Sequence, residues 1–206
     1  MSQSRFRVIA TPQNTFTYGS SQTSLSGERS DSMRRLVILG NAGSGKSTLA
    51  KRLAARIGAP VVHLDAYFWQ PGWQPTPRAE WTERVRALAA QDSWIMDGNY
   101  AATLELRLSR ADTVVVLDLP RAQCLYRVVR RGLLERGRSR SDLAVGCREQ
   151  LPDREFLRWI WRFPTDELEP MLREVDTAGA AGRQVTLRSS EDIANFLASA
   201  NAGSVG

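Results

Sequence analysis

The chain has 206 residues, 42% of them hydrophobic, and carries a formal net charge of +6. This length predicts one domain with a sizeable core. No apolar run approaches the ~20 residues that a membrane-spanning helix needs, and no secretory apolar region precedes the first core strand, so we expect a cytoplasmic protein without a membrane partner. Cys124 and Cys147 are the only cysteines and lack metal-ligand spacing, which excludes a disulfide framework and a zinc site.

Residues 1–32 are rich in Ser, Gln and Thr and show no periodic apolar positions, which predicts disorder. Met33 stands directly before the first predicted core strand, and we hypothesise that it is the natural start of the protein. A single domain is expected over residues 33–200, followed by a short disordered tail over 201–206. No internal repeat is visible.

A phosphate-binding motif follows the first predicted strand, a short apolar run at 36–39. The pattern G-x-x-x-x-G-K-[ST] is fitted by Gly40, Asn41, Ala42, Gly43, Ser44, Gly45, Lys46, Ser47 and Thr48. Glycines let successive backbone N–H groups surround phosphate oxygens, while Lys46 is expected to reach the β- and γ-phosphates and Ser47 to ligate Mg²⁺. Apolar residues at helical spacing then predict a helix that Gly58-Ala59-Pro60 ends.

The remaining chain alternates predicted strands and helices. Strands are expected at 60–65, 93–97, 113–118 and 184–187. Pro77 opens one intervening helix and Pro164 ends another, an aromatic loop is expected at 66–73, and Ser189-Ser190 caps the last helix. The lone histidine, His63, is expected in or near the core rather than as a catalytic base. This alternation predicts an α/β fold with a parallel sheet covered on both faces and ligands at the carboxyl ends of its strands.

Acidic residues end several of the predicted strands. Asp97 and Asp118 are both candidates to support Mg²⁺, and we favour Asp97 because Gly98 turns the chain sharply beside the phosphates. Asp65 is expected to act on an acceptor hydroxyl as a general base or to orient a Mg²⁺-bound water, the alternative being a helix or turn cap. Nearby aromatic side chains either stack on a ligand or belong to the core and lid: Tyr67, Trp69 and Trp73.

A basic segment with few apolar residues extends over 130–150. Its arginines are Arg130, Arg131, Arg136, Arg138, Arg140 and Arg148. Next to a phosphate loop, such a segment favours a mobile lid whose arginines neutralise charge on a transferring phosphoryl group and exclude water. The alternatives are a nucleic-acid contact and an ordinary solvated basic surface.

These motifs resemble the P-loop nucleoside and nucleotide kinases related to adenylate kinase, and within that group the small proteins often labelled DNA-topology-modulation proteins. The likeness covers residues 34–197. It rests on the phosphate loop and on His63-Leu64-Asp65-x-x-Phe68-Trp69, Trp94-Ile95-Met96-Asp97-Gly98-Asn99-Tyr100, Arg140-x-Asp142, Gly146-Cys147-x-Glu149 and Phe156-Leu-x-Trp-Ile-Trp161.

The resemblance implies a three-layer P-loop NTPase fold with a five-stranded parallel sheet of order 2-3-1-4-5 and an arginine-rich lid. By this likeness Asp97 takes the place of the acidic Mg²⁺-associated residue, and Ser189 lies in the loop that often holds adenine. The lid arginines are Arg127, Arg131 and Arg140. Adenylate kinases have Phe-Pro-Arg where this chain has Asn99-Tyr100, and this departure argues against AMP as the acceptor.

The sequence thus predicts an ATP- and Mg²⁺-dependent kinase with Lys46, Asp65 and the lid arginines as catalytic residues. Its partners are ATP and a nucleoside, nucleotide or other small hydroxyl acceptor, and the sequence favours none of these acceptors and no oligomeric state. A nucleotide-dependent DNA-binding or regulatory protein is the less favoured alternative, although neither a helix-turn-helix nor a zinc finger is present. A P-loop ATPase that acts as a switch without an acceptor is a third reading.

Overall fold

The computed structural model describes residues 33–138 and 142–200. The predictions of disorder for residues 1–32 and 201–206, and the role of Arg140, lie outside this part of the chain. No helix among the described residues is long and apolar enough to cross a membrane.

Five parallel strands form one central sheet in the order β2-β5-β1-β6-β7. Their bounds are β1 Arg35–Gly40, β2 Val61–His63, β5 Trp94–Asp97, β6 Thr113–Leu117 and β7 Gln184–Leu187. The two short strands β3 (Trp69–Gln70) and β4 (Gln74–Pro75) pair antiparallel in a separate hairpin. Counting only the strands of the main sheet, the order is 2-3-1-4-5, which confirms the predicted α/β topology.

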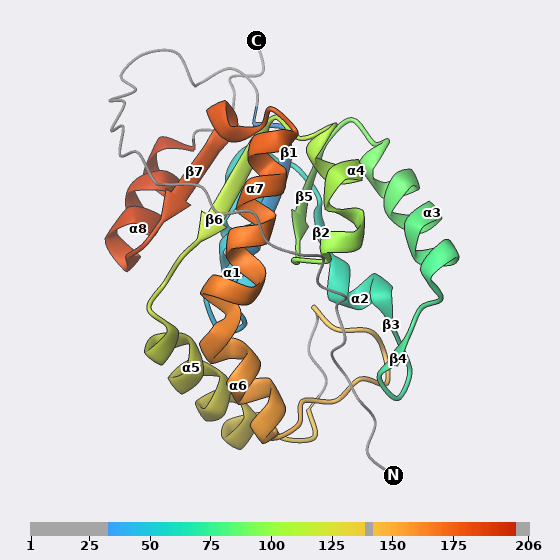
Figure 1. Ribbon diagram of the computed structural model, residues 1–206, viewed down its shortest axis with the longest axis vertical. Coiled ribbons are helices and arrows are strands. Elements are labelled where there is room, and N and C mark those ends of the chain that lie inside the picture. Colours follow the sequence, from blue (N-terminus) through green and yellow to red (C-terminus); the bar gives the residue numbers. More distant parts are fainter. Residues whose placement is uncertain (1–32, 139–141, 201–206) are drawn as a thin grey trace.

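Helices cover both faces of this sheet (Figure 1). Alternate residues of β1 pack to opposite sides because side chains of a strand alternate in direction. Leu36 and Ile38 pack in one core cluster with apolar residues of α1 (Lys46–Ile57) and α8 (Ser190–Ser199). Val37 and Leu39 pack in the other cluster, whose helices are α3 Arg78–Ala89, α4 Leu104–Leu108 and α7 Glu169–Thr177. The result is the predicted three-layer arrangement.

Two further helices, α5 (Arg121–Leu134) and α6 (Arg154–Phe163), pack against each other beyond the carboxyl ends of the strands (Figure 1). Their shared apolar cluster contains Leu119, Cys124, Val128 and Ile160. Helix α5 continues through Leu134 and therefore takes up the start of the predicted basic segment. This pair of helices stands next to the phosphate loop.

The polypeptide departs from the predicted elements at Pro164 and Asp65. Pro164 was expected to end a helix, but a π-helical turn (Pro164–Leu168) carries the chain from α6 directly into α7. Proline has no N–H to donate, and a wider turn at this point accommodates the missing hydrogen bond. Asp65 was expected at a strand end, but β2 stops at His63 and Asp65 lies in the short helix α2 (Leu64–Phe68), which occupies part of the predicted aromatic loop.

In the pairing register, the carboxyl end of β1 extends past the last residue of β5 but not past that of β6. Ile38 is opposite Asp97, the last residue of β5, whereas Gly40 is still paired with Leu117 of β6. The peptide groups of Gly40 on the β5 side therefore extend past the last residue of that strand. The 3₁₀ turn Ala101–Thr103 then leads from the post-β5 turn into α4.

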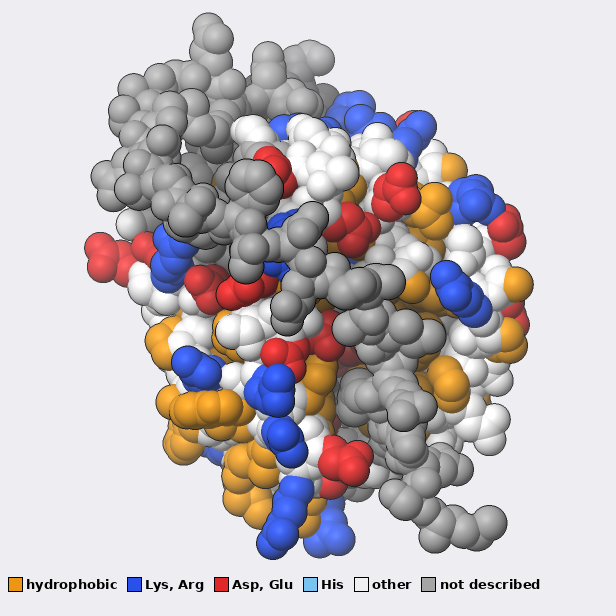
Figure 2. All heavy atoms as spheres, viewed as in Figure 1, with side chains coloured by type: hydrophobic (Ala, Val, Ile, Leu, Met, Phe, Trp, Pro, Cys, Tyr) orange, Lys and Arg blue, Asp and Glu red, His pale blue; other side chains and the backbone are white. Residues whose placement is uncertain are grey.

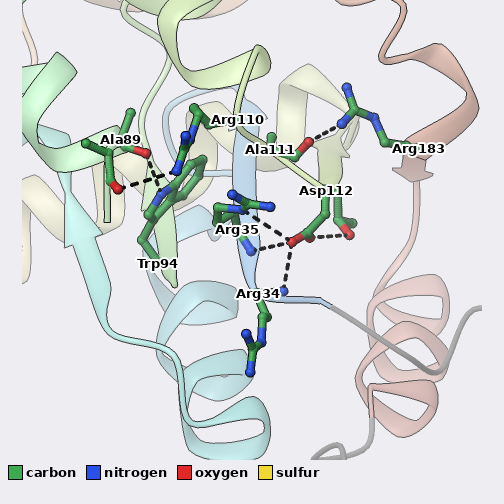
Figure 3. Close-up of polar contacts among 10 residues, drawn as sticks. Arg34, Arg35, Ala89, Trp94, Arg110, Ala111, Asp112 and Arg183 are labelled. Atoms are coloured by element: carbon green, nitrogen blue, oxygen red, sulfur yellow. Dashed lines mark hydrogen bonds and ion pairs between the residues drawn. The ribbon is translucent and has the colours of Figure 1, made fainter. Parts of the chain in front are cut away.

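Asp112 holds the amino-terminal ends of the strands, opposite the site (Figure 3). Its carboxylate accepts hydrogen bonds from the backbone N–H groups of Arg34 (3.0 Å) and Arg35 (2.8 Å), just before β6 begins. Arg183, at the end of the 3₁₀ turn before β7, donates to the carbonyl of Ala111. These contacts align the starts of β1, β6 and β7, and the site residues lie at the other ends of the strands.

Candidate functional site

The phosphate loop joins β1 to α1 and depends on two glycines. Gly40 has φ 146° and Gly43 has φ 78°, which other residues rarely adopt. A Cβ at Gly40 would lie 2.6 Å from the carbonyl oxygen of Leu117, and one at Gly43 would collide with the carbonyl of Cys124 in α5. The loop therefore lies tightly against β6 and α5, and α1 begins within it at Lys46.

Lys46 is folded back onto this loop. Its Nζ donates to the carbonyl oxygens of Gly40 (2.8 Å) and Asn41 (2.9 Å). Burial lowers the pKa of Lys46, and the negative charges of Asp97 and then Asp65 oppose that effect. The predicted catalytic lysine thus lies within electrostatic reach of both predicted carboxylates.

Asp97 closes β5 and is only 6% exposed. Its register partner on β2 is His63, whose Nδ1 lies 3.0 Å from Asp97 Oδ2. The imidazole N–H donates to the carboxylate, because an ionised carboxylate only accepts. The His63 side chain is nearly buried, which agrees with the predicted position in or near the core. Its contact with Asp97 was not predicted.

Asp65 and Tyr100 form the second acidic position. The Tyr100 hydroxyl donates to Asp65 Oδ1 at 2.5 Å. Water reaches the Asp65 side chain, yet crowding by protein atoms raises its pKa; the Tyr100 hydrogen bond counteracts this rise, whereas Asp97 and Asp142 add to it. Burial beside Asp65 also raises the pKa of Tyr100, so the phenol remains a proton donor.

The turn after β5 is held by two residues that sequence reasoning did not assign. The side chain of Asn99 bonds both peptide groups of Gly40, as acceptor from N–H (3.1 Å) and donor to C=O (3.0 Å). Arg107 is 0% exposed and donates to the carbonyls of Gly98 (2.9 Å) and Tyr100 (3.1 Å). Burial lowers the pKa of Arg107 to about 10, which leaves it cationic. Its spacing from Leu104 and Leu108, on the buried stripe of α4, was the signal available in the sequence.

Of the predicted lid arginines, two are within the described residues. Arg127 of α5 donates to the carbonyls of Gly43 and Ser44, both at 3.4 Å. Arg131, one turn further along α5, pairs with Glu149 at 3.0 Å and contributes positive charge at Lys46. Both therefore lie on the side of α5 that faces the site, and their closure over a phosphoryl group stays a prediction.

The segment that follows α5 contacts the β3–β4 hairpin. Gly146 approaches Pro71, where a Cβ would lie 3.1 Å from the proline ring. The thiol of Cys147 donates to Gln70 O at 3.3 Å, and Trp73 Nε1 donates to Arg148 O at 3.3 Å. Residues 146–148 of the predicted basic segment thus contact the predicted aromatic loop.

Asp118 and Ser189 take other partners. Asp118, the less favoured candidate for Mg²⁺ support, pairs with Arg188 at 3.5 Å. Ser189 caps α8, where its hydroxyl accepts from the N–H of Asp192 and the Asp192 carboxylate accepts from the Ser189 N–H. The capping prediction for Ser189 is confirmed, and its position beside adenine stays a prediction.

The residues of the loop fit a magnesium-bound polyphosphate. Ser44 Oγ is buried without a hydrogen-bond partner in the described part of the chain, and its hydroxyl can donate to a phosphate oxygen. Asn41 Oδ1 is also buried without a partner, but as an acceptor it does not bind phosphate oxygens. No cluster of three or more His, Cys, Asp or Glu suited to a metal occurs among the described residues. Ser47 and Asp97 supply hard oxygen atoms of the kind Mg²⁺ takes while its remaining ligands come from phosphates and water.

No family model matches the chain, and a search of curated proteins gives no match.

Proposed function

We propose that the chain is an adenylate-kinase-like phosphotransferase that uses ATP and Mg²⁺ and phosphorylates a small hydroxyl acceptor, a nucleoside or a nucleotide. One observation carries the proposal: Lys46 of a complete phosphate loop lies in the field of two carboxylates that have different surroundings. Asp97 is buried at the strand end next to β1, whereas Asp65 is reached by water and hydrogen-bonded by a phenol. Distinct environments give two carboxylates distinct roles.

The donor side comprises the phosphate loop with Ser47 and Asp97. The loop amides and the N-terminus of α1 bind the phosphates, because helix N-termini and inward N–H groups favour anions. Ser47, with Asp97 in support, would hold Mg²⁺, which would supply charge neutralisation for the phosphate oxygens. His63 fixes the orientation of the Asp97 carboxylate through its 3.0 Å contact. Ser189, in the loop between β7 and α8, is proposed to lie near adenine.

The acceptor side comprises Asp65 and Tyr100. We infer that Asp65 accepts a hydrogen bond from the acceptor hydroxyl and takes its proton as transfer proceeds, the role a positioned carboxylate has in kinases. A raised pKa suits a general base that works near neutral pH, since base strength grows with pKa. Lys46, Arg127 and Arg131 neutralise charge on the transferring phosphoryl group. We propose the same charge-neutralising role for Arg140.

ATP turnover by the full chain with Mg²⁺ tests this function. The acceptor panel comprises nucleosides, nucleoside monophosphates and small polyols, and mass spectrometry of the products identifies any phosphorylated compound. Turnover that one acceptor stimulates, with that acceptor phosphorylated, is the expected result. ATP binding that no acceptor stimulates would instead support a switch ATPase or a DNA-linked regulator, and a chain that does not bind ATP would refute the proposal.

A further inference from the structure

Lys46 bonds to two carbonyl oxygens, and each of them has a second donor. The carbonyl of Gly40 accepts from Lys46 Nζ at 2.8 Å and from Asn99 Nδ2 at 3.0 Å. The carbonyl of Asn41 accepts from Lys46 Nζ at 2.9 Å and from the backbone N–H of Ser44 at 3.2 Å. Lys46 can therefore leave both carbonyls without depriving either of a hydrogen bond.

Only one of the two second donors is a side chain. Asn99 reaches Gly40 because β5 ends at Asp97, opposite Ile38, while β1 continues to Gly40. Its amide replaces the missing strand on that side and bonds both the N–H and the C=O of the buried Gly40. The hydrogen-bonding pattern of the sheet is thus extended by a side chain into the phosphate loop.

Asn99 is itself held in place by its surroundings. Arg107 donates to the carbonyl of Asn99 and to those of its neighbours Gly98 and Tyr100. The backbone N–H of Gly98 donates to Ile38 O at 3.3 Å, which joins the same turn to β1. An amide fixed at both its backbone and its side chain gives Gly40 a partner whether or not Lys46 is bound.

We propose that Asn99 is a positioning residue for the lysine: it keeps the Gly40 carbonyl hydrogen-bonded so that Lys46 is free to move to the phosphates of ATP. This inference rests on the proposed function. Leaving a buried carbonyl without a donor is unfavourable by an amount that corresponds to roughly a 5- to 30-fold change in an equilibrium constant. Without the Asn99 donor, Lys46 stays on Gly40 and ATP binds less well.

Two substitutions separate this role from a charge effect. Asn99→Asp keeps the oxygen that accepts from Gly40 N–H, replaces the Nδ2 donor with an oxygen and adds a negative charge. Asn99→Ala removes both hydrogen bonds and adds no charge. Asn195→Asp on the exposed side of α8 makes the same charge change away from the loop and is the matched control.

The first readout compares the affinity for ATP with the turnover rate at saturating ATP. Both Asn99 variants are expected to raise the Kd and KM for ATP about 5- to 30-fold and to leave kcat at saturating ATP within about twofold, because Lys46 acts normally once it has moved. Asn195→Asp should match the wild type. An equal loss in kcat and in ATP affinity would mark Asn99 as merely structural and overturn the inference.

The second readout needs no nucleotide. Lys46 and Lys51 are the only lysines in the chain, and Lys51 is exposed, so it serves as an internal reference in limited amine labelling followed by mass spectrometry. The Lys46-to-Lys51 labelling ratio should fall in both Asn99 variants, because the lysine is held more firmly on Gly40. An unchanged ratio together with unchanged ATP affinity would refute the role of Asn99 and leave the kinase proposal standing.

The two proposals fail in different ways. If the wild-type chain does not bind ATP, the proposed function fails, and with it the nucleotide part of this inference, whatever the labelling shows. Thermal denaturation establishes that each variant is folded. If Asn99→Asp does not fold, Asn99→Ala, which introduces no charge beside the loop, decides the question by the same two readouts.

Discussion

Lys46 donates hydrogen bonds to loop carbonyls and takes no part in the described apolar clusters of the sheet. Lys46→Ala should therefore reduce ATP-dependent phosphoryl transfer by about 100-fold or more while the fold persists, since a lost charge-stabilising donor acts on the transition state. Turnover assays and circular dichroism measure the two effects. Lys51→Ala, on the same helix, is the control and should be near wild type. Unfolding of Lys46→Ala would contradict the assignment.

Asp97 is the last residue of β5 and Asp118 directly follows β6, and these two strands lie on either side of β1. The two carboxylates have different partners. Asp97 is buried against His63, whereas Asp118 pairs with Arg188 at 3.5 Å. Asp97→Asn should raise the Mg²⁺ concentration for half-maximal turnover about 10-fold, as loss of a metal-supporting carboxylate does, and Asp118→Asn should leave it nearly unchanged. A magnesium titration of both variants decides, and the reverse order would transfer the role to Asp118.

Asp65 and Tyr100 together set the acid limb of the pH profile. Asp65 serves as a base only when ionised, and crowding by protein raises its pKa, so turnover should begin to fall at a higher pH than for an ordinary aspartate. Tyr100→Phe removes a hydrogen bond that lowers this pKa, and the acid limb should move to still higher pH. The pH dependence of kcat/KM for the acceptor measures this shift, and Tyr67→Phe, which removes an exposed phenol of α2, is the control. A limb that moves to lower pH would contradict the role of Asp65.

At the scale of elements, the turn between β5 and α4 depends on one buried cation. Arg107→Met leaves the carbonyls of Gly98 and Asn99 without the donor that Arg107 supplies and should lower the free energy of unfolding by about 3 kcal/mol. Arg110→Met is the matched control, because Arg110 is exposed and its side chain donates to Ala90 O at 3.4 Å. Its loss should stay within about 0.5 kcal/mol. Urea denaturation compares the two, and equal effects would refute the special role of Arg107.

The features that the sequence predicted well are those with a local signal in a few consecutive residues. The apolar run before Gly40, the Gly58 stop and the Ser189 cap are local signals, and each is found where expected. Residues whose roles depend on distant partners were missed. Asn99 bonds a glycine 59 positions away, and an arginine on a short helix such as Arg107 ordinarily points to solvent. The wide turn at Pro164 was also missed, because proline after a helical pattern usually marks its end.

At the scale of the whole molecule, the chain carries a net charge of +6, and the face in Figure 2 does not show it gathered into a single basic patch. Figure 2 shows Lys and Arg side chains interspersed with Asp and Glu on the face in view. Ion pairs join Arg84 to Glu80, Arg131 to Glu149 and Arg162 to Asp166. We therefore expect weak DNA binding and no stimulation of ATP turnover by DNA. Titrations at two salt concentrations test this, because many phosphate contacts give a steep salt dependence. Tight, strongly salt-dependent binding would favour the DNA-linked alternative.

The contact between the β3–β4 hairpin and the segment after α5 affects how substrate choice can change. Gln70 and Pro71 lie against Cys147 and Gly146, and the same segment reaches α5 through Glu149 and Arg131. The two stretches are separated by 77 positions between Gln70 and Cys147, yet each shapes the other's surface. Exchanging one of them alone for the corresponding stretch of a different protein would remove these contacts. If the chain has the proposed function, an engineer who wishes to redirect it to a new acceptor must therefore transplant both stretches as a matched set.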